Sequence, residues 1–204
     1  MIAIDIGLAG HALLLATMAA AIVRRRRWGG WARMLPLALG LASLVPLAGP
    51  SLAGRLFGLV GALSITTLAL LALAIASFLS GREWLPQRDR RTLLAGVAAA
   101  ALVLYPLSLG FADFDPYEAG YGSPYLLGLL ALYALGAWLA GCHLTVAVIT
   151  AALAAHLVGL MESDNLWDYL IDAPLAAYAM GSWLRVAAKR VRAVRAGEGL
   201  RGIP

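Results

Sequence analysis

The sequence predicts an all-α protein, a polytopic transmembrane helical bundle of about seven spans. Three observations predict it: the composition, a series of long apolar stretches, and the separation of basic from acidic residues along the chain. Of the 204 residues, 62% are apolar and only 13% are charged, with a mean hydropathy of +0.82. Soluble domains carry about 25% charged residues. A bilayer is therefore the solvent that suits this chain.

Seven stretches are long and apolar enough to be membrane spans. A helix needs roughly 17 to 25 apolar residues to cross a hydrocarbon core of about 30 Å. Helices are expected because lipid cannot satisfy exposed backbone donors and acceptors. The least regular stretches are the second, which contains Pro36, Pro46 and Pro50, and the seventh, which contains Asp168 and Asp172. The predicted spans are residues 2–23, 34–53, 56–80, 92–112, 125–142, 144–161 and 166–184.

The basic residues predict the orientation of the bundle. Three clusters follow the first, third and seventh spans, and alternating spans place all three on one side. Arg55 is the single exception among the sixteen Lys and Arg residues. The positive-inside rule makes the basic side cytoplasmic, with the N-terminus outside and the C-terminus cytoplasmic. The clusters are Arg24–Arg27 with Arg33; Arg82, Arg88, Arg90 and Arg91; and Arg185, Lys189, Arg190, Arg192, Arg195 and Arg201.

The acids are a partly independent check on this folding, because the orientation rule weights Lys and Arg. All but three of the eleven acids fall on the predicted outer side. The first span is not expected to be a cleaved signal, since its positive charges follow the apolar run. We therefore expect one transmembrane domain, residues 1–184, and a basic cytoplasmic tail, residues 185–204. The outer acids are Asp5, Asp113, Asp115, Glu118, Glu162, Asp164, Asp168 and Asp172.

The most polar stretch is residues 162–172, which we take as the first part of a candidate functional cluster. Asp164, Asp168 and Asp172 are spaced i, i+4, i+8, so a continuous helix would place them on one face. Glu162 and Asn165 accompany them. The favoured interpretation is an interfacial turn with its acids facing water. In the alternative, Asp168 and Asp172 point into the bundle, where a carboxylate needs a partner, water or an ion.

Two acids in the loop of residues 111–124 extend the cluster. Asp113 and Asp115 come before a run of Pro and Gly that indicates a structured turn. Together with residues 162–172 they would form a negative rim that concentrates cations or meets a basic partner. Carboxylate oxygens suit Ca²⁺ or Mg²⁺, but the segment lacks the spacing of an EF-hand, so a metal site is left undecided.

Two histidines lie within predicted spans. His11 in the first and His156 in the sixth could together ligate a b-type haem or join a proton path. A single membrane histidine more often hydrogen-bonds a neighbouring helix, so His156 stays in the polar cluster and no cofactor is expected. The one cysteine, Cys142, excludes an internal disulfide.

The prolines of the second span also leave two interpretations open. With the Gly-rich start of the third span, they could mark a broken-helix hairpin of the kind that lines transporter cavities. A tilted helix with an interfacial end is the favoured alternative.

No reaction motif is present. The chain has no Walker A loop, zinc-protease motif, nucleophile elbow or dinucleotide fingerprint, and its basic tail lacks the platform that nucleic-acid binding needs. We expect a multi-pass protein of the bacterial inner membrane, non-catalytic, acting as an accessory or complex subunit. Its partners would be the bilayer and another membrane protein or a second copy. The alternatives are a small transporter for a cation or proton-coupled solute that uses outer-half carboxylates, and an intramembrane enzyme acting on a lipid-linked substrate.

Overall fold

The computed structural model of the protein is all-helical. It describes residues 2–26, 30–46, 49–111 and 114–195, and these segments contain no strand. The elements are α1 (Ile2–Arg26), η1 (Gly30–Arg33), α2 (Leu35–Ala42), α3 (Leu52–Val60), α4 (Ile65–Ser80), α5 (Gln87–Pro106), η2 (Leu107–Phe111), η3 (Pro116–Gly120), α6 (Pro124–Leu139), α7 (His143–Leu157), α8 (Leu166–Leu170) and α9 (Ala173–Arg195).

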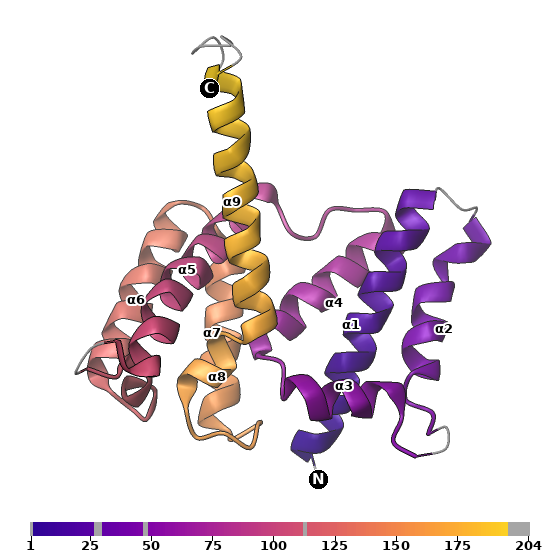
Figure 1. Ribbon diagram of the computed structural model, residues 1–204, viewed down its shortest axis with the longest axis horizontal. Coiled ribbons are helices and arrows are strands. Elements are labelled where there is room, and N and C mark those ends of the chain that lie inside the picture. Colours follow the sequence, from indigo (N-terminus) through magenta and orange to yellow (C-terminus); the bar gives the residue numbers. More distant parts are fainter. Residues whose placement is uncertain (1, 27–29, 47–48, 112–113, 196–204) are drawn as a thin grey trace.

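The helices form two groups that lie side by side (Figure 1). In one group α1 packs against α2, α3 and α4; in the other, α5 packs against α7 and α9, and α7 against α6 and α8. The groups meet where α4 packs against α7 and α8. The larger core belongs to the second group and includes Leu94, Ala152 and Tyr169. The start of α9 and the short helix α8 are thus held at the junction of the two groups.

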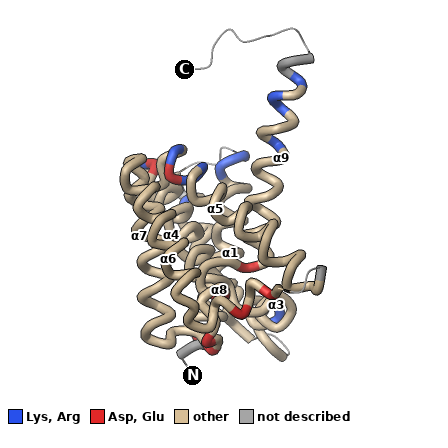
Figure 2. Tube along the Cα trace, turned by 90° about the vertical axis from the view of Figure 1, so that its left-hand side faces the viewer, with Lys and Arg blue, Asp and Glu red and all other residues tan. Residues whose placement is uncertain are grey.

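Basic and acidic residues gather at opposite ends of the bundle (Figure 2). The basic end is formed by the last turn of α1, the α4–α5 connection with the first turn of α5, and α9. The acidic end contains the N-terminus, η3 and the residues before α8. Helix α3, which carries Arg55, lies across the acidic end (Figure 1). We use the names acidic end and basic end in this sense below.

Among the residues that the structure describes, two helices are long and apolar enough to cross a membrane, Asp5–Arg26 and Gln87–Gly110. Three other apolar helices are shorter, Ile65–Ser80, Pro124–Leu139 and His143–Leu157. At 1.5 Å per residue, 15 or 16 residues extend over about 22–24 Å, less than a hydrocarbon core of about 30 Å. The helix lengths alone therefore give two candidate spans rather than seven.

The second and third predicted spans are wrong as continuous helices. In the described part of residues 34–53, the eight-residue helix α2 is followed by turns and then by the first two residues of α3. Residues 56–80 are divided between α3 and α4 by a break at Gly61, whose φ of 83° suits glycine. The break separates α3 from α4. The side chain of Ser51 caps the N-terminus of α3, and that of Ser64 caps the N-terminus of α4. The break fits the broken-helix interpretation, and the position of α3 across the acidic end fits the interfacial end of the tilted-helix interpretation, so both stay predictions.

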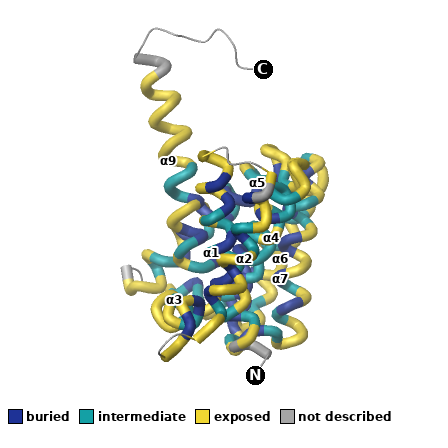
Figure 3. The backbone as a smooth tube through the Cα atoms, turned by 90° about the vertical axis from the view of Figure 1, so that its right-hand side faces the viewer, coloured by how far each residue is buried: buried dark blue, intermediate teal, exposed yellow. Residues whose placement is uncertain are grey.

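The seventh predicted span is also divided. Helix α8 ends at Leu170, Ile171 is extended with φ −145° and ψ 142°, and α9 begins at Ala173. The predicted continuous helix that would stack Asp164, Asp168 and Asp172 is therefore wrong. At its other end α9 continues as a helix through the predicted start of the tail to Arg195, and residues 183–192 are all exposed (Figure 3).

Candidate functional site

Asp172 joins the two helix groups. One carboxylate oxygen accepts a hydrogen bond from the backbone N–H of Leu175 at 2.7 Å and so caps α9. The other accepts from the backbone N–H of Ser64 at 2.8 Å and from the hydroxyl of Thr67 at 2.5 Å, in the first turn of α4. The N-termini of both helices thus face the same carboxylate, and both helix dipoles stabilise its negative charge.

Asp168 lies four residues before Asp172, on α8, and two hydroxyl groups hold its carboxylate. The phenol of Tyr117 donates to the carboxylate, at 3.0 and 3.2 Å from its two oxygens, and the hydroxyl of Ser163 donates at 2.5 Å. A carboxylate offers about four acceptor positions. Two donors leave Asp168 with unused capacity, whereas three donors nearly fill that of Asp172.

Asn165 fixes the loop that carries these groups. Its side-chain oxygen caps α8 through the N–H of Trp167, and its side-chain N–H donates to the backbone carbonyl of Tyr117 at 2.9 Å. The Asn165 side chain is fully buried against Gly120, where an added Cβ would lie only 1.7 Å from its oxygen. The indole N–H of Trp167 adds a bond to the carbonyl of Pro116 at 2.9 Å. The close approach of η3 to α8 therefore requires glycine at position 120.

Asp168 and Asp172 line one cavity of about 360 Å³ between the two helix groups. Its walls come from the start of α1, from α3 and the break before α4, from α5 and from residues 161–173. Ser163 and Tyr105 add hydroxyl groups, and Glu162 adds a third carboxyl group. None of the described residues that line it is a Lys, Arg or His. The cavity has carboxylates and hydroxyl groups among largely apolar walls, and it is of the size of a small-molecule site.

Tyr117 is itself perturbed by this arrangement. Burial, followed by the hydrogen bond to Asp168 and by the charge of Asp168, raises the pKa of Tyr117 well above its usual value. A phenol next to a carboxylate resists losing its proton because a second negative charge there would be repelled. Tyr117 therefore remains a hydrogen-bond donor to Asp168 at neutral pH.

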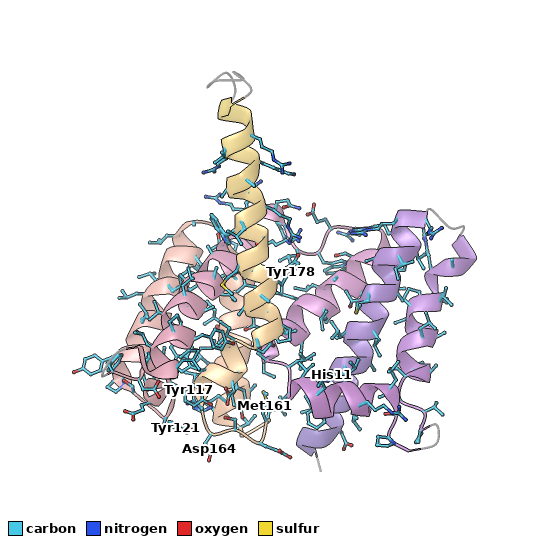
Figure 4. The ribbon with its side chains drawn as sticks, viewed as in Figure 1. His11, Tyr117, Tyr121, Met161, Asp164 and Tyr178 are labelled. Carbon is cyan, nitrogen blue, oxygen red and sulfur yellow. The ribbon has the colours of Figure 1, made fainter. Side chains whose placement is uncertain are left out.

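The structure separates the other predicted acids from this cavity. Asp115 caps η3 through the N–H of Tyr117 and accepts from the hydroxyl of Ser108, so its role is local. Asp164 is exposed at the acidic end and points away from the helices (Figure 4). Asp113 lies outside the described residues. Of the predicted polar cluster, Glu162, Asp168 and Asp172 come together in the cavity, and Asn165 supports them from behind.

The two histidines have different neighbours. Nδ1 of His11 donates to the carbonyl of Gly7 at 2.8 Å, and the fully buried ring packs edge-on against Phe57 (Figure 4). His156 packs against the ring of Tyr169, with centroids 5.1 Å apart. Neither histidine lines the cavity. In the part of the chain that the structure describes, no three His, Cys, Asp or Glu side chains gather as a metal site would require.

Sequence reasoning missed the partners of the carboxylates. Ser64 and Thr67 are recognisable as polar residues in an apolar stretch, but their spacing equally suits bonds within their own helix or to a neighbour. Tyr117 and Tyr105 carry no signal beyond being aromatic residues near the ends of apolar stretches. Their common position depends on long-range packing between segments about 50 to 100 residues apart, as the bonds from Tyr117 and Thr67 show.

No known family model matches this chain, and no curated protein or solved structure is significantly similar to it. The function has to be argued from the cavity.

Proposed function

We propose that this protein is a multi-pass bacterial inner-membrane carrier that binds a small cation or protonated amine in the cavity formed around Asp168 and Asp172. The observation that carries the proposal is the meeting of two carboxylates in one cavity whose described lining contains no basic side chain. Both carboxylates are half-buried, two like charges in one cavity repel each other, and a bound cation offsets that repulsion.

The charge distribution supports the membrane placement. The basic end carries the residues that the positive-inside rule assigns to the cytoplasm, so the acidic end with its cavity faces outward in this proposal. The broken elements support it as well. Non-helical backbone at membrane depth is tolerated where it lines a cavity, and the break at Gly61 to Leu63 borders this one.

Asp168 is the residue that we expect to bind the cation. It lines the cavity and has unused acceptor positions, while Tyr117 and Ser163 hold its carboxylate in place. Asp172 is engaged by three donors, so it contributes charge and holds the walls together. A protonated amine would donate hydrogen bonds to Asp168 and would also be attracted by the negative charge of Asp172. This attraction is stronger in the cavity than in water.

Movement between the two helix groups offers a route for release. The two groups meet along a limited set of elements, α4 against α7 and α8, and the cavity lies at this junction. Rocking of one group against the other would change the access to Asp168, as in carriers that move bundles around a central site.

The test is uptake of radiolabelled amines and monovalent cations into vesicles that contain the purified protein. Asp168→Asn should reduce saturable uptake at least about tenfold, because it removes a charged acceptor worth about 1.5–3 kcal/mol. Asp164→Asn is the matched control, since this carboxylate is exposed and does not line the cavity. Uptake that is equal in the two variants would rule out the proposed role of Asp168.

A second candidate function is that of an accessory subunit, and one observation favours it. The exposed part of α9 projects beyond the bundle at the basic end and carries Arg185, Lys189, Arg190 and Arg192 on a helical continuation (Figures 1 and 3). Such a rod would suit an acidic partner protein. Affinity purification from native membranes with the full chain and with a chain ending at Leu184 tests it. The same recovered proteins in both would count against this function.

A further inference from the structure

An apolar groove lies on the surface of the bundle between α1 and α4. One wall contains Ile6, Ala9 and Leu13, and the other contains Ile65, Leu68 and Ala72. The groove has a volume of about 410 Å³, and its lining is almost entirely apolar. Ile6 lines both the groove and the carboxylate cavity, so the two spaces adjoin.

Small side chains keep this groove open. Ala9, Gly10, Ala69 and Ala72 contribute no bulk, and Ala9 and Ala72 remain exposed on the bundle surface. From Ile6 to Leu13 the helix rises by about 10 Å, away from the acidic end and toward the middle of the bundle. The carboxylate-lined cavity and the apolar groove thus share Ile6 as a wall, and the groove has the length of several carbon atoms.

We infer that the ligand of the cavity is an amphiphile, a lipid with an ammonium group on its head, whose acyl chain lies in the groove between α1 and α4. This inference rests on the proposed function and names its substrate class. Charge complementarity assigns the ammonium to Asp168, and the continuity through Ile6 assigns the chain to the groove. A lipid enters such a site laterally from the bilayer, with its head at the acidic end and its chain toward the midplane.

The two parts of the site have different energetic roles. A lipid tail is as apolar in the bilayer as it is against Leu and Ala, so the groove does not discriminate between lipids and instead provides the space that the chain of a bound lipid needs. Selection between lipids therefore depends on the head, where hydrogen bonds to a charged acceptor form. We therefore expect lipid binding to depend strongly on the charge of the head group and to require an open groove.

The experiment measures lipid binding to the purified full-length protein by native mass spectrometry in a non-ionic detergent. The probes are phosphatidylethanolamine and phosphatidylglycerol with identical chains, which share a phosphate and differ in the ammonium. Ala69→Phe fills the groove from α4, and Ala9→Phe fills it from α1. Ala74→Phe is the matched control, because Ala74 is an exposed residue of α4 outside the groove. Binding of ethanolamine alone is followed by calorimetry.

In the wild type and in Ala74→Phe we expect phosphatidylethanolamine to bind at least about tenfold more tightly than phosphatidylglycerol. Both groove-filling variants should lose most of this lipid binding while ethanolamine still binds. The lipid inference would be overturned if the groove-filling variants bound the lipid as tightly as Ala74→Phe does. If ethanolamine binding still depended on Asp168 in that case, the proposed function would stand. Absence of any Asp168-dependent binding of ethanolamine or lipid would overturn both.

Discussion

The three hydrogen bonds that Asp172 accepts predict that this one carboxylate holds the two helix groups together. Replacing Asp172 with Ala removes the cap of α9, worth about 1 kcal/mol. It also removes two bonds from α4 to a charged acceptor, each worth about 1.5–3 kcal/mol. Because these bonds share one acceptor and the freed groups can partly relax, we expect a total loss of about 4 kcal/mol in the free energy of unfolding.

Two further variants separate the parts of this loss. Asp172→Asn keeps a good helix cap, so it should lose only the α4 side, about 2–3 kcal/mol. Thr67→Val removes one donor from the same carboxylate oxygen and should cost about 1.5 kcal/mol. Since the two residues are in contact, the double variant should show a coupling energy of about 1 kcal/mol.

The assay is reversible unfolding of the detergent-solubilised protein by increasing sodium dodecyl sulfate, followed by the fluorescence of its six tryptophans. Asp164→Ala is the reference, because it also removes one carboxylate near the acidic end but an exposed one. If Asp172→Ala destabilises the protein no more than Asp164→Ala, Asp172 does not bridge the two groups and the description of the junction is wrong.

The remaining predictions concern the support of the site. Gly120→Ala should destabilise the protein by about 2 kcal/mol or more in the same assay, since its Cβ would overlap the oxygen of Asn165; Gly128→Ala, in open space on α6, should instead be neutral or stabilising by up to about 1 kcal/mol. Because the pKa of Tyr117 is raised in the folded state, the folded protein keeps the phenol proton at a pH where the unfolded chain, with a pKa of about 10, releases it. The free energy of unfolding should therefore fall as the pH rises above about 10. Tyr117→Phe should reduce this slope in unfolding measured from pH 8 to 12, and an unchanged slope would show that another group causes it.

The sequence predicts the helical class and the separation of charge because both depend on local patterns. Apolar stretches and the residues between them are visible one segment at a time, so the positions of α1, α5, α6 and α7 agree with the predicted spans to within six residues at each end. The breaks are less visible. Gly61 and Ile171 interrupt helices in stretches where hydropathy gives no sign of a break. The helix that follows each break is stabilised by a capping side chain, Ser64 for α4 and Asp172 for α9.

The candidate site could be located but not assembled from the sequence. The stretch of residues 162–172 was identified because carboxylates are rare in apolar sequence. Which of them face inward could not be decided, because the helix that was expected to carry them changes direction between Asp168 and Asp172. The partners of those carboxylates come from η3 and α4, and no local pattern links either element to α8.

The Asp172 bridge also sets an order on biosynthesis. Ser64 and Asp172 are 108 residues apart, so at about 5–20 residues per second the ribosome adds Asp172 roughly 5 to 20 s after Ser64. During that interval α4 begins without its carboxylate, and the cavity lacks the wall that α8 and the start of α9 supply. A chain released before Asp172 is made would keep the first helix group with the first turn of α4 lacking its carboxylate. The site is thus completed only after residues up to the start of α9 have been made.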